Sequence, residues 1–209
     1  MNRILIVCSH ADDEVLGCGG IISRFVREGK WVGVLCFSTE ASGDEIDDAR
    51  KILEYEYWHT LLYPDNLFDT KPVLNSAELI EDIIGEKKPD TIFTHWHGDL
   101  NQDHRHVSHA VRIATRPVPG QVVKRVYEFE TLSSSEWGFD GKAFAPNVFF
   151  ELSGDDYENK RSALESYKSQ IREYPHSRSI LGIGFLAQIR GAQSGNYFSE
   201  AFILVREMK

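Results

Sequence analysis

The first half of the chain alternates short apolar runs with segments of helical periodicity, and this alternation constrains the fold more than any other feature. The apolar runs are continuous and bounded by polar residues, as is typical of strands that are covered on both faces. These runs lie at 3–9, 31–39, 59–64 and 90–96, and the segments expected to contain helices lie at 14–30, 42–58, 75–88 and 104–116. Strand–helix repeats of this length predict βαβ units and a mainly parallel sheet.

The closing third of the chain follows a different pattern. Residues 122–132, 147–153 and 200–207 resemble additional strands, and they flank a predicted helix at 156–174. No linker separates this part from the first half, so we expect one domain over residues 1–209. The predicted fold class is α/β, a Rossmann-like three-layer sandwich whose mainly parallel sheet carries extra C-terminal strands.

Composition and charge limit the classes of partner. The 209 residues include 23 basic and 32 acidic side chains, a net charge of −9, so nucleic acid and anionic membranes are not expected as partners. No apolar run approaches the ~20 residues that span a bilayer, and the apolar segment at the start is too short for a signal peptide. Three cysteines without CxxC spacing fit reduced thiols. We therefore expect a cytoplasmic protein, either alone or as a homo-oligomer, with a small-molecule partner.

Polar side chains that can bind a metal or take part in catalysis follow the first and the fourth apolar runs. His10, Asp12 and Asp13 come directly after the first run, and residues 95–106 hold four of the eight histidines of the chain. Ligands of open parallel α/β sheets bind at the carboxyl ends of the strands, where these two clusters are expected to be neighbours. Imidazoles and carboxylates together are ligands for zinc and similar divalent ions, and a bound dication would offset the repulsion between adjacent aspartates.

Simpler explanations exist for each of these residues taken alone. An aspartate at the start of a helix is usually a cap that the helix dipole favours, and a histidine at a strand end is usually structural. Two such clusters at two strand ends make coincidence the poorer explanation. Within the second cluster, His104 is best placed to face the strand ends, because it follows Asp103 at the junction of loop and helix.

Four short motifs resemble, in sequence and in order, those of the LmbE/PIG-L-type zinc-dependent N-deacetylases. They are SHADDE at 9–14, HGDLNQDH at 97–104, ALESYKSQ at 163–170 and RGAQSGNYFSEAF at 190–202. The first motif alone is moderately specific, whereas the ordered set is strongly specific and spans most of the chain. The resemblance implies hydrolytic removal of an N-acetyl or other N-acyl group from an amino sugar or glycoconjugate.

The resemblance also implies roles for individual residues. His10, Asp13 and His104 would ligate Zn²⁺ or another divalent metal, with a water molecule completing the site. The metal would lower the pKa of that water toward ~7, and Asp12 would be the general base that takes its proton as it attacks the amide. Asp103 would orient a ligand.

One position departs from the family pattern. The family commonly has a histidine three residues before the last ligand, where it helps to stabilise the oxyanion, and this chain has Asn101 there. An amide can donate a hydrogen bond to an oxyanion but cannot act as an acid. His97, His106 and His176 are the candidates for a charged role in its place.

A further set of residues has weaker claims to substrate binding. Arg50 or Arg190 would bind a phosphate or a sugar, although a salt bridge within this acidic protein explains each of them equally well. Trp96 would stack on a sugar ring, although an aromatic residue at a strand end usually packs in the core. His176 lies in the segment 175–179, which we expect to form a loop at the pocket.

A dinucleotide-binding loop is one alternative, suggested by the glycines of GCGG at 17–20 after the first strand. The GxGxxG spacing fails, because residue 22 is isoleucine, and the preceding acids would repel a pyrophosphate. The glycines are instead expected to allow close packing of the helix.

A magnesium-binding, receiver-like signalling domain is a second alternative, in which Asp65 would be the phosphoacceptor. Such a domain binds its ion with hard oxygen ligands and has no need of His10 or His104. A metal-binding but inactive homologue is a third alternative, for which Asn101 is the hint.

Overall fold

The structure is a computed structural model of the chain, and it describes residues 1–38, 41–139, 141 and 143–209. In this part of the chain, seven strands form one sheet in the order β3-β2-β1-β4-β5-β7-β6. The first five strands along the chain are parallel, and β7 is antiparallel to both β5 and β6. The strands are β1 (Arg3–His10), β2 (Trp31–Ser38), β3 (Tyr57–Thr60), β4 (Thr91–His95), β5 (Arg125–Phe129), β6 (Val148–Leu152) and β7 (Phe198–Glu207).

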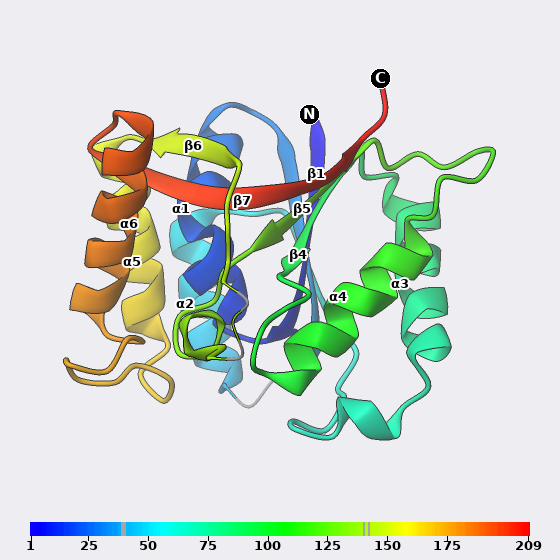
Figure 1. Ribbon diagram of the computed structural model, residues 1–209, viewed down its shortest axis with the longest axis horizontal. Coiled ribbons are helices and arrows are strands. Elements are labelled where there is room, and N and C mark those ends of the chain that lie inside the picture. Colours follow the sequence, from blue (N-terminus) through cyan, green and yellow to red (C-terminus); the bar gives the residue numbers. More distant parts are fainter. Residues whose placement is uncertain (39–40, 140, 142) are drawn as a thin grey trace.

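Helices cover both faces of the sheet (Figure 1), with an apolar core between each helical layer and the strands. One layer comprises α3 (Val73–Lys87) and α4 (Gln102–Ala114), and the other comprises α1 (Asp13–Arg27), α2 (Gly43–Leu53), α5 (Gly154–Ser166) and α6 (Ile180–Ser194). This arrangement confirms the predicted α/β fold class with its extra C-terminal strands. Within the described ranges, no helix is long and apolar enough to cross a membrane.

The order of the central strands brings the two polar clusters together. β1 lies between β2 and β4, and Val7 of β1 is paired with Leu35 on one side and with Thr94 on the other. All three strands run in the same direction, so the segments that follow β1 and β4 leave the sheet at the same edge. The sequence analysis predicted this proximity.

The third strand differs from its prediction. The expected strand at 59–64 is observed at Tyr57–Thr60, and the chain leaves the sheet after residue 60. Leu62 has a φ of 55°, in the left-handed region, and this backbone conformation is incompatible with a continuing strand. Thr39, the last residue of the second predicted strand, lies outside the described residues.

The helix α6 has no counterpart among the predicted elements, and the helix predicted at 156–174 ends at Ser166. The glycines of α6 lower its helical propensity, and for this reason the helix was not predicted from the sequence. Packing requires them, because a Cβ at Gly182 would lie 2.0 Å from the carbonyl oxygen of Ser177. A Cβ at Gly191 would likewise lie 2.6 Å from the carbonyl oxygen of Tyr197.

The glycines of residues 17–20 lie inside α1 and allow close packing, as predicted. A Cβ at Gly17 would lie 2.2 Å from the ring of Phe129, at the end of β5. A Cβ at Gly20 would lie 2.4 Å from the side chain of Leu152, at the end of β6. The helix that begins at the pocket is therefore pressed against the strands of the closing third of the chain.

A buried ion pair fixes α1 to that closing third. Lys160 of α5 donates to the carbonyl oxygen of Leu16 (2.8 Å) and to Glu200 of β7 (2.6 Å). The Glu200 carboxylate accepts the backbone N–H groups of Gly20 (2.9 Å) and Ile21 (2.8 Å). The carbonyl of residue 16 and the N–H of residue 20 bond to each other in a regular α-helix. The ion pair therefore bonds to two backbone groups of α1 that would otherwise be expected to bond to each other.

Two glycine substitutions test the packing of α1. Gly17→Ala should lower the free energy of unfolding by about 1–3 kcal/mol, because the added methyl group overlaps the ring of Phe129. The matched control is Gly85→Ala in the exposed face of α3, where a Cβ meets no atom within 4 Å. This control should stabilise the protein by up to about 1 kcal/mol. Urea unfolding curves measure both values, and equal effects of the two substitutions would contradict the packing argument.

Candidate active site

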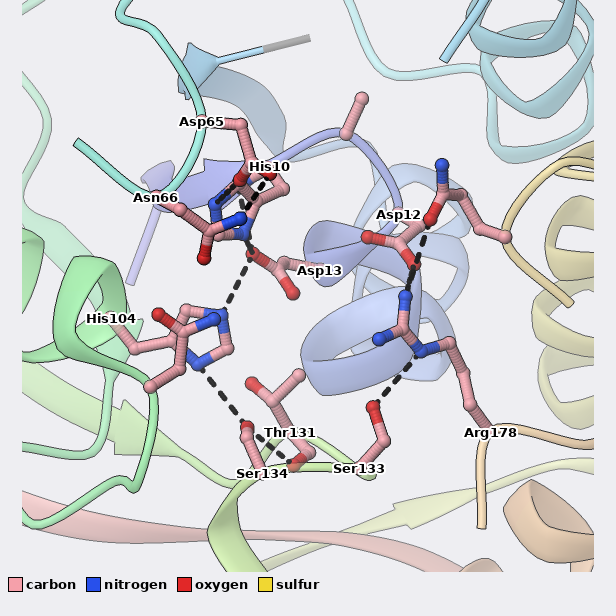
Figure 2. A pocket seen from close by; sticks show the side chains of 13 residues that line it. His10, Asp12, Asp13, Asp65, Asn66, His104, Thr131, Ser133, Ser134 and Arg178 are labelled. Carbon is pink, nitrogen blue, oxygen red and sulfur yellow. Dashed lines mark hydrogen bonds and ion pairs between the residues drawn. The ribbon is translucent and has the colours of Figure 1, made fainter. Parts of the chain in front are cut away.

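A polar pocket of about 220 Å³ lies at the carboxyl edge of the parallel strands. Five segments that are distant in sequence contribute to it: the β1–α1 junction, the segment after β3, the start of α4, the segment after β5 and the segment after α5 (Figure 2). Its lining residues are His10, Ala11, Asp12, Asp13, Asp65, Asn66, Asn101, His104, Thr131, Ser133, Ser134, Gln170 and Arg178.

Three residues expected to bind a metal lie together in this pocket. His10 is the last residue of β1, Asp13 is the first residue of α1, and His104 lies in the first turn of α4. One potential ligand atom from each lies within 4.8 Å of those of the other two. Oδ2 of Asp13 is 3.3 Å from His10 Nδ1 and 3.5 Å from His104 Nε2. Asp13 and His104 are almost fully buried.

The backbone between β1 and α1 has an unusual conformation that separates the two aspartates. Asp12 has a φ of 117°, a region that residues other than glycine rarely adopt, and its side chain makes no capping hydrogen bond to α1. The N–H of Asp12 donates to Glu14 (3.0 Å), and the N–H of His10 donates to Asp13 (2.8 Å). The simple explanation of Asp12 as a helix cap therefore does not hold.

Carboxylates on the far side of His10 determine how its ring is turned. Nε2 of His10 lies 2.8 Å from Asp65 and 3.3 Å from Asp103, which leaves Nδ1 facing Asp13. Burial alone would lower the pKa of His10, but its hydrogen bonds to Asp103, Asp13 and Asp65 raise it to about 12. Asp103 also accepts the N–H of Asn66 (2.7 Å), so it ties the segment after β3 to the pocket.

His104 is oriented by an acid that the sequence analysis did not select. Its Nδ1 lies 3.2 Å from Asp99, whose other oxygen accepts hydrogen bonds from Ser134 and Ser135. The carboxylate holds the imidazole so that Nε2 faces Asp13, as carboxylates commonly do for metal-binding histidines. Asp99 lies within the HGDLNQDH motif and the histidine-rich segment 95–106, and this position is its signal in the sequence.

His95 is a second residue that the sequence analysis left without a role. Its ring is fully buried and stacks on that of His104, with 3.9 Å between the ring centroids. Nε2 accepts the N–H of Ser9 (2.9 Å), so the proton of the neutral ring is on Nδ1, which lies 3.2 Å from Thr131. Burial and the charge of His104 lower the pKa of His95 to about 4. His95 is therefore a neutral support for His104.

Asp12 and Asp13 have opposite electrostatic surroundings. Burial alone would raise the pKa of Asp13, but the imidazole of His104 and the hydrogen bond to His10 hold it well below its usual value. Burial and the charge of Asp13 raise the pKa of Asp12, and the guanidinium of Arg178, 3.2 Å away, opposes this shift. Environments that separate the pKa values of two neighbouring carboxyl groups are a common feature of acid–base sites.

Glu14 stabilises the strained backbone at Asp12. Its carboxyl group is fully buried and accepts a hydrogen bond from Tyr167 (2.6 Å) as well as from the backbone of Asp12. Burial raises the pKa of Glu14 to about 7, against the opposing effect of the Tyr167 hydroxyl. Tyr167 belongs to the ALESYKSQ motif, so this motif contributes to the pocket through Glu14 and through Gln170, which lines it.

Asn101 lines the pocket at the N-terminus of α4. Its Oδ1 caps this helix by accepting the N–H of Asp103 (2.8 Å), and its own N–H donates to Asp99 (2.8 Å). The side-chain amide nitrogen is the group of Asn101 that can donate to a substrate.

The histidines proposed for a charged role lie outside the residues that line the pocket. His97 contacts Glu128 (2.8 Å), and His106 contacts Ser76 (2.8 Å). His176 accepts the backbone N–H of Arg178 (3.0 Å). The predicted loop at 175–179 does reach the pocket, but it does so through Arg178, a residue that the sequence analysis did not select.

The other residues suggested for substrate binding also lie outside the pocket lining. Arg50 donates to the backbone carbonyl of Glu56 (2.9 Å), and Arg190 forms an ion pair with Glu130. Trp96 is 3% exposed, and its ring covers Gly98. The ion pair of Arg190 and the burial of Trp96 agree with the structural explanations given for these two residues, whereas Arg50 is held by backbone carbonyls rather than by an acidic side chain.

The chain belongs to the PIG-L family, described as GlcNAc-PI de-N-acetylase, because the model of this family matches residues 5–115, more than half of the sequence. This match confirms the family resemblance of the sequence motifs. A protein of Escherichia coli (strain K12) described as uncharacterized deacetylase YaiS is 28% identical over 179 residues, which cover 79% of this chain and 90% of that protein.

Solved structures share the fold. N,N'-diacetylchitobiose deacetylase of Pyrococcus horikoshii superimposes with a TM-score of 0.77 at 17% identity, covering 98% of this chain and 84% of that one. The 4-carboxy-2-hydroxymuconate hydratase GalB of Pseudomonas putida KT2440 superimposes with a TM-score of 0.78 at 19% identity, covering 100% and 98%. One of these neighbours is a deacetylase and the other is a hydratase, so the shared fold does not determine the reaction.

The support that Tyr167 gives to Glu14 can be tested by unfolding. Tyr167→Phe should lower the free energy of unfolding by about 1–3 kcal/mol, because a fully buried carboxyl group loses a hydrogen-bond donor. The matched control is Tyr157→Phe in the same helical layer, whose ring stacks on Phe198. Its effect should stay within about 0.5 kcal/mol. Chemical denaturation compares the two, and a Tyr167→Phe variant as stable as the control would remove Glu14 from this structural role.

Proposed function

We propose that the protein is a metal-dependent hydrolase that removes an N-acetyl group from an amino sugar or glycoconjugate. The observation that carries this proposal is the convergence of His10, Asp13 and His104 in one pocket, beside a carboxylate, Asp12, that is not part of the cluster. Membership in a de-N-acetylase family supports the reaction class.

The residues present fit a metal ion. Two imidazoles and one carboxylate within reach of one another form the donor set of a catalytic zinc site, which keeps one position open. A cation also suits a pocket in which Asp12, Asp13 and Asp65 face one cavity. When bound, the ion polarises the acyl carbonyl and makes water a better nucleophile. Zinc is the ion that this donor set favours, and other borderline divalent ions share the preference.

The surrounding residues would orient the metal-binding groups. Asp103 turns the ring of His10, and Asp99 turns the ring of His104, each through the nitrogen that faces away from Asp13. Fixed imidazole orientations of this kind strengthen metal binding. Asp65 shares Nε2 of His10 with Asp103, so a second group of potential ligands, His10, Asp65 and Asp103, overlaps the first. The shared histidine favours one ion rather than two.

Asp12 is suited to move protons during the reaction. Its carboxylate is buried, is not used as a helix cap and is not part of the cluster of potential metal ligands, and burial raises its pKa above the ordinary value. In the proposed reaction Asp12 takes a proton from the attacking water. It returns the proton to the amine nitrogen as the C–N bond breaks.

The size and lining of the pocket support a sugar-like substrate. A volume of about 220 Å³ is below the roughly 300–1,000 Å³ of sites for drug-sized ligands, so only the acylated end of a larger conjugate would enter. Asn66, Thr131, Ser133 and Gln170 offer hydroxyl and amide groups suited to sugar hydroxyls. Family membership leaves no support for a receiver-like signalling domain. Measurement of acetate release distinguishes an enzyme from an inactive metal-binding homologue.

Metal binding is tested with two histidines of the same helix. Wild-type protein should bind about one zinc ion per chain, and His104→Ala should lose most of this metal, because it removes one of three ligands. His109→Ala, on the exposed face of α4, should keep the wild-type content. Elemental analysis after dialysis gives the stoichiometry. A wild-type protein without affinity for divalent ions, or a His104→Ala variant that retains zinc, would refute the proposed site.

Catalysis is tested by acetate release from a panel of N-acetylated sugars and sugar nucleotides, with and without zinc. Asp12→Asn should keep its zinc and lose at least about 10²-fold in kcat, because it removes the general base. The control Asp82→Asn, on the exposed face of α3, should remain fully active. No acetate from any substrate with zinc-loaded wild-type protein would favour the inactive homologue, and an active Asp12→Asn variant would exclude Asp12 as the base.

A further inference from the structure

The guanidinium group of Arg178 is held at the pocket by three side chains, two of which come from distant parts of the chain. Nη1 donates to Asp12 (3.2 Å) and to Gln170 (3.3 Å), and Nε donates to Ser133 (3.0 Å). These contacts fix the plane of the guanidinium, and the side chain is only 27% exposed. The group is therefore pre-positioned before any substrate arrives.

The remaining nitrogen of this group is free to donate. Among the described residues, Nη2 of Arg178 has no hydrogen-bond partner, whereas Nη1 and Nε both do. Figure 2 shows this nitrogen on the side of the guanidinium that faces the middle of the pocket, in the direction of Asp13 and His104. A charged donor without a partner thus faces the groups proposed to activate the substrate.

Apart from its histidines, the described lining of the pocket has no other positively charged donor for a developing negative charge. Of the lining residues that the structure describes, Arg178 is the one lysine or arginine. Asn101, which stands where the family commonly has a histidine, offers a neutral amide whose oxygen is used to cap α4. His97, His106 and His176 do not line the pocket. Arg178 can therefore supply the positive charge for which these histidines were the candidates, and it does so from the segment after α5.

We propose that Arg178 is a catalytic residue, whose Nη2 donates a hydrogen bond to the acyl oxygen as that oxygen becomes negatively charged. This inference rests on the proposed deacetylation. Water attacks the carbonyl carbon, and the π electrons of the C=O bond move to the oxygen that faces Nη2. When the C=O bond re-forms, the C–N bond breaks, and the nitrogen takes the proton carried by Asp12. The products are acetic acid and the free amine, and transfer of the acid proton to the amine leaves acetate and an ammonium group.

A charged guanidinium is well suited to this task. Donors aimed at the atom on which charge develops stabilise the transition state more than the ground state, particularly in a pocket that excludes water. The planar fork of arginine allows one nitrogen to hold Asp12 while the other faces the substrate. A lysine in this position would supply a charge to Asp12 but no second nitrogen, and this difference separates an oxyanion donor from a residue that only neutralises Asp12.

The kinetic test uses zinc-loaded protein and three variants. Arg178→Ala and Arg178→Lys should both lose about 10²–10³-fold in kcat, the usual effect of removing one oxyanion donor, with KM changed only a few-fold. Arg172→Ala is the matched control, because Arg172 lies in the same segment and, among the described residues, its side chain donates only to backbone carbonyls of residues 169 and 171. It should keep the wild-type kcat. Millimolar guanidinium should restore part of the activity of Arg178→Ala, whereas uncharged urea of similar shape should not.

Three kinetic outcomes would overturn the proposal. Wild-type kcat in Arg178→Lys would reduce Arg178 to a counter-ion of Asp12. A raised KM with unchanged kcat would make it a binding residue that acts equally on the ground state and the transition state. Equal losses in Arg172→Ala and Arg178→Ala would assign the effect to the fold of the segment.

A binding measurement decides the proposal without turnover. Acetate carries two oxygens like the one that Nη2 is proposed to contact, and calorimetry on zinc-loaded protein should show at least 10-fold weaker binding of acetate to Arg178→Ala than to wild type, at equal zinc content. Unchanged acetate affinity would count against Arg178 as a donor to the acyl oxygen. If wild-type protein released acetate from no substrate, the proposed function would fail, while an Arg178-dependent affinity for acetate would still support the donor.

Discussion

One carboxylate oxygen lies at the centre of the site, and the arrangement of the surrounding segments depends on it. Oδ2 of Asp13 is within 3.5 Å of ring nitrogens of His10, His95 and His104 and also accepts a backbone N–H. These imidazoles come from the ends of β1 and β4 and from the start of α4. A buried carboxylate is tolerated only among such partners, and His10 and His104 are the two of these imidazoles proposed to share a cation with it.

The closing third of the chain completes this site rather than forming a separate addition. Tyr167 supports Glu14, which in turn accepts the backbone N–H of the left-handed Asp12. Lys160 and Glu200 form hydrogen bonds with backbone groups of α1, the helix that begins at Asp13. Strained conformations persist only where the surroundings determine them strongly, and here three later elements do so. The strain separates two adjacent carboxylates and points them at different partners.

That separation lets neighbouring residues have different chemical roles. Asp13 faces imidazoles and is held in its charged form, whereas Asp12 faces a guanidinium from the opposite wall and has a raised pKa. A single turn of backbone thus provides both a group suited to a cation and a group suited to a proton. Arg178 connects the second of these groups to the segment after α5, so the base and the proposed oxyanion donor are positioned by the same contact.

Local sequence determined the layers of the fold and three of the residues at the centre of the pocket. Apolar runs and helical periodicity reveal parallel strands, and polar residues at strand ends then indicate His10, Asp13 and His104. Arg178 carries no such signal, because an arginine in an acidic protein usually forms an ordinary salt bridge, and the strand-end pattern does not distinguish Asp99 from the other acid of its motif, Asp103. Their roles come from contacts across the fold, such as that of Arg178 with a residue 166 positions earlier. The sequence by itself determined which residues reach the edge of the sheet; only tertiary packing decided which of them face the same cavity, because that depends on how distant segments meet.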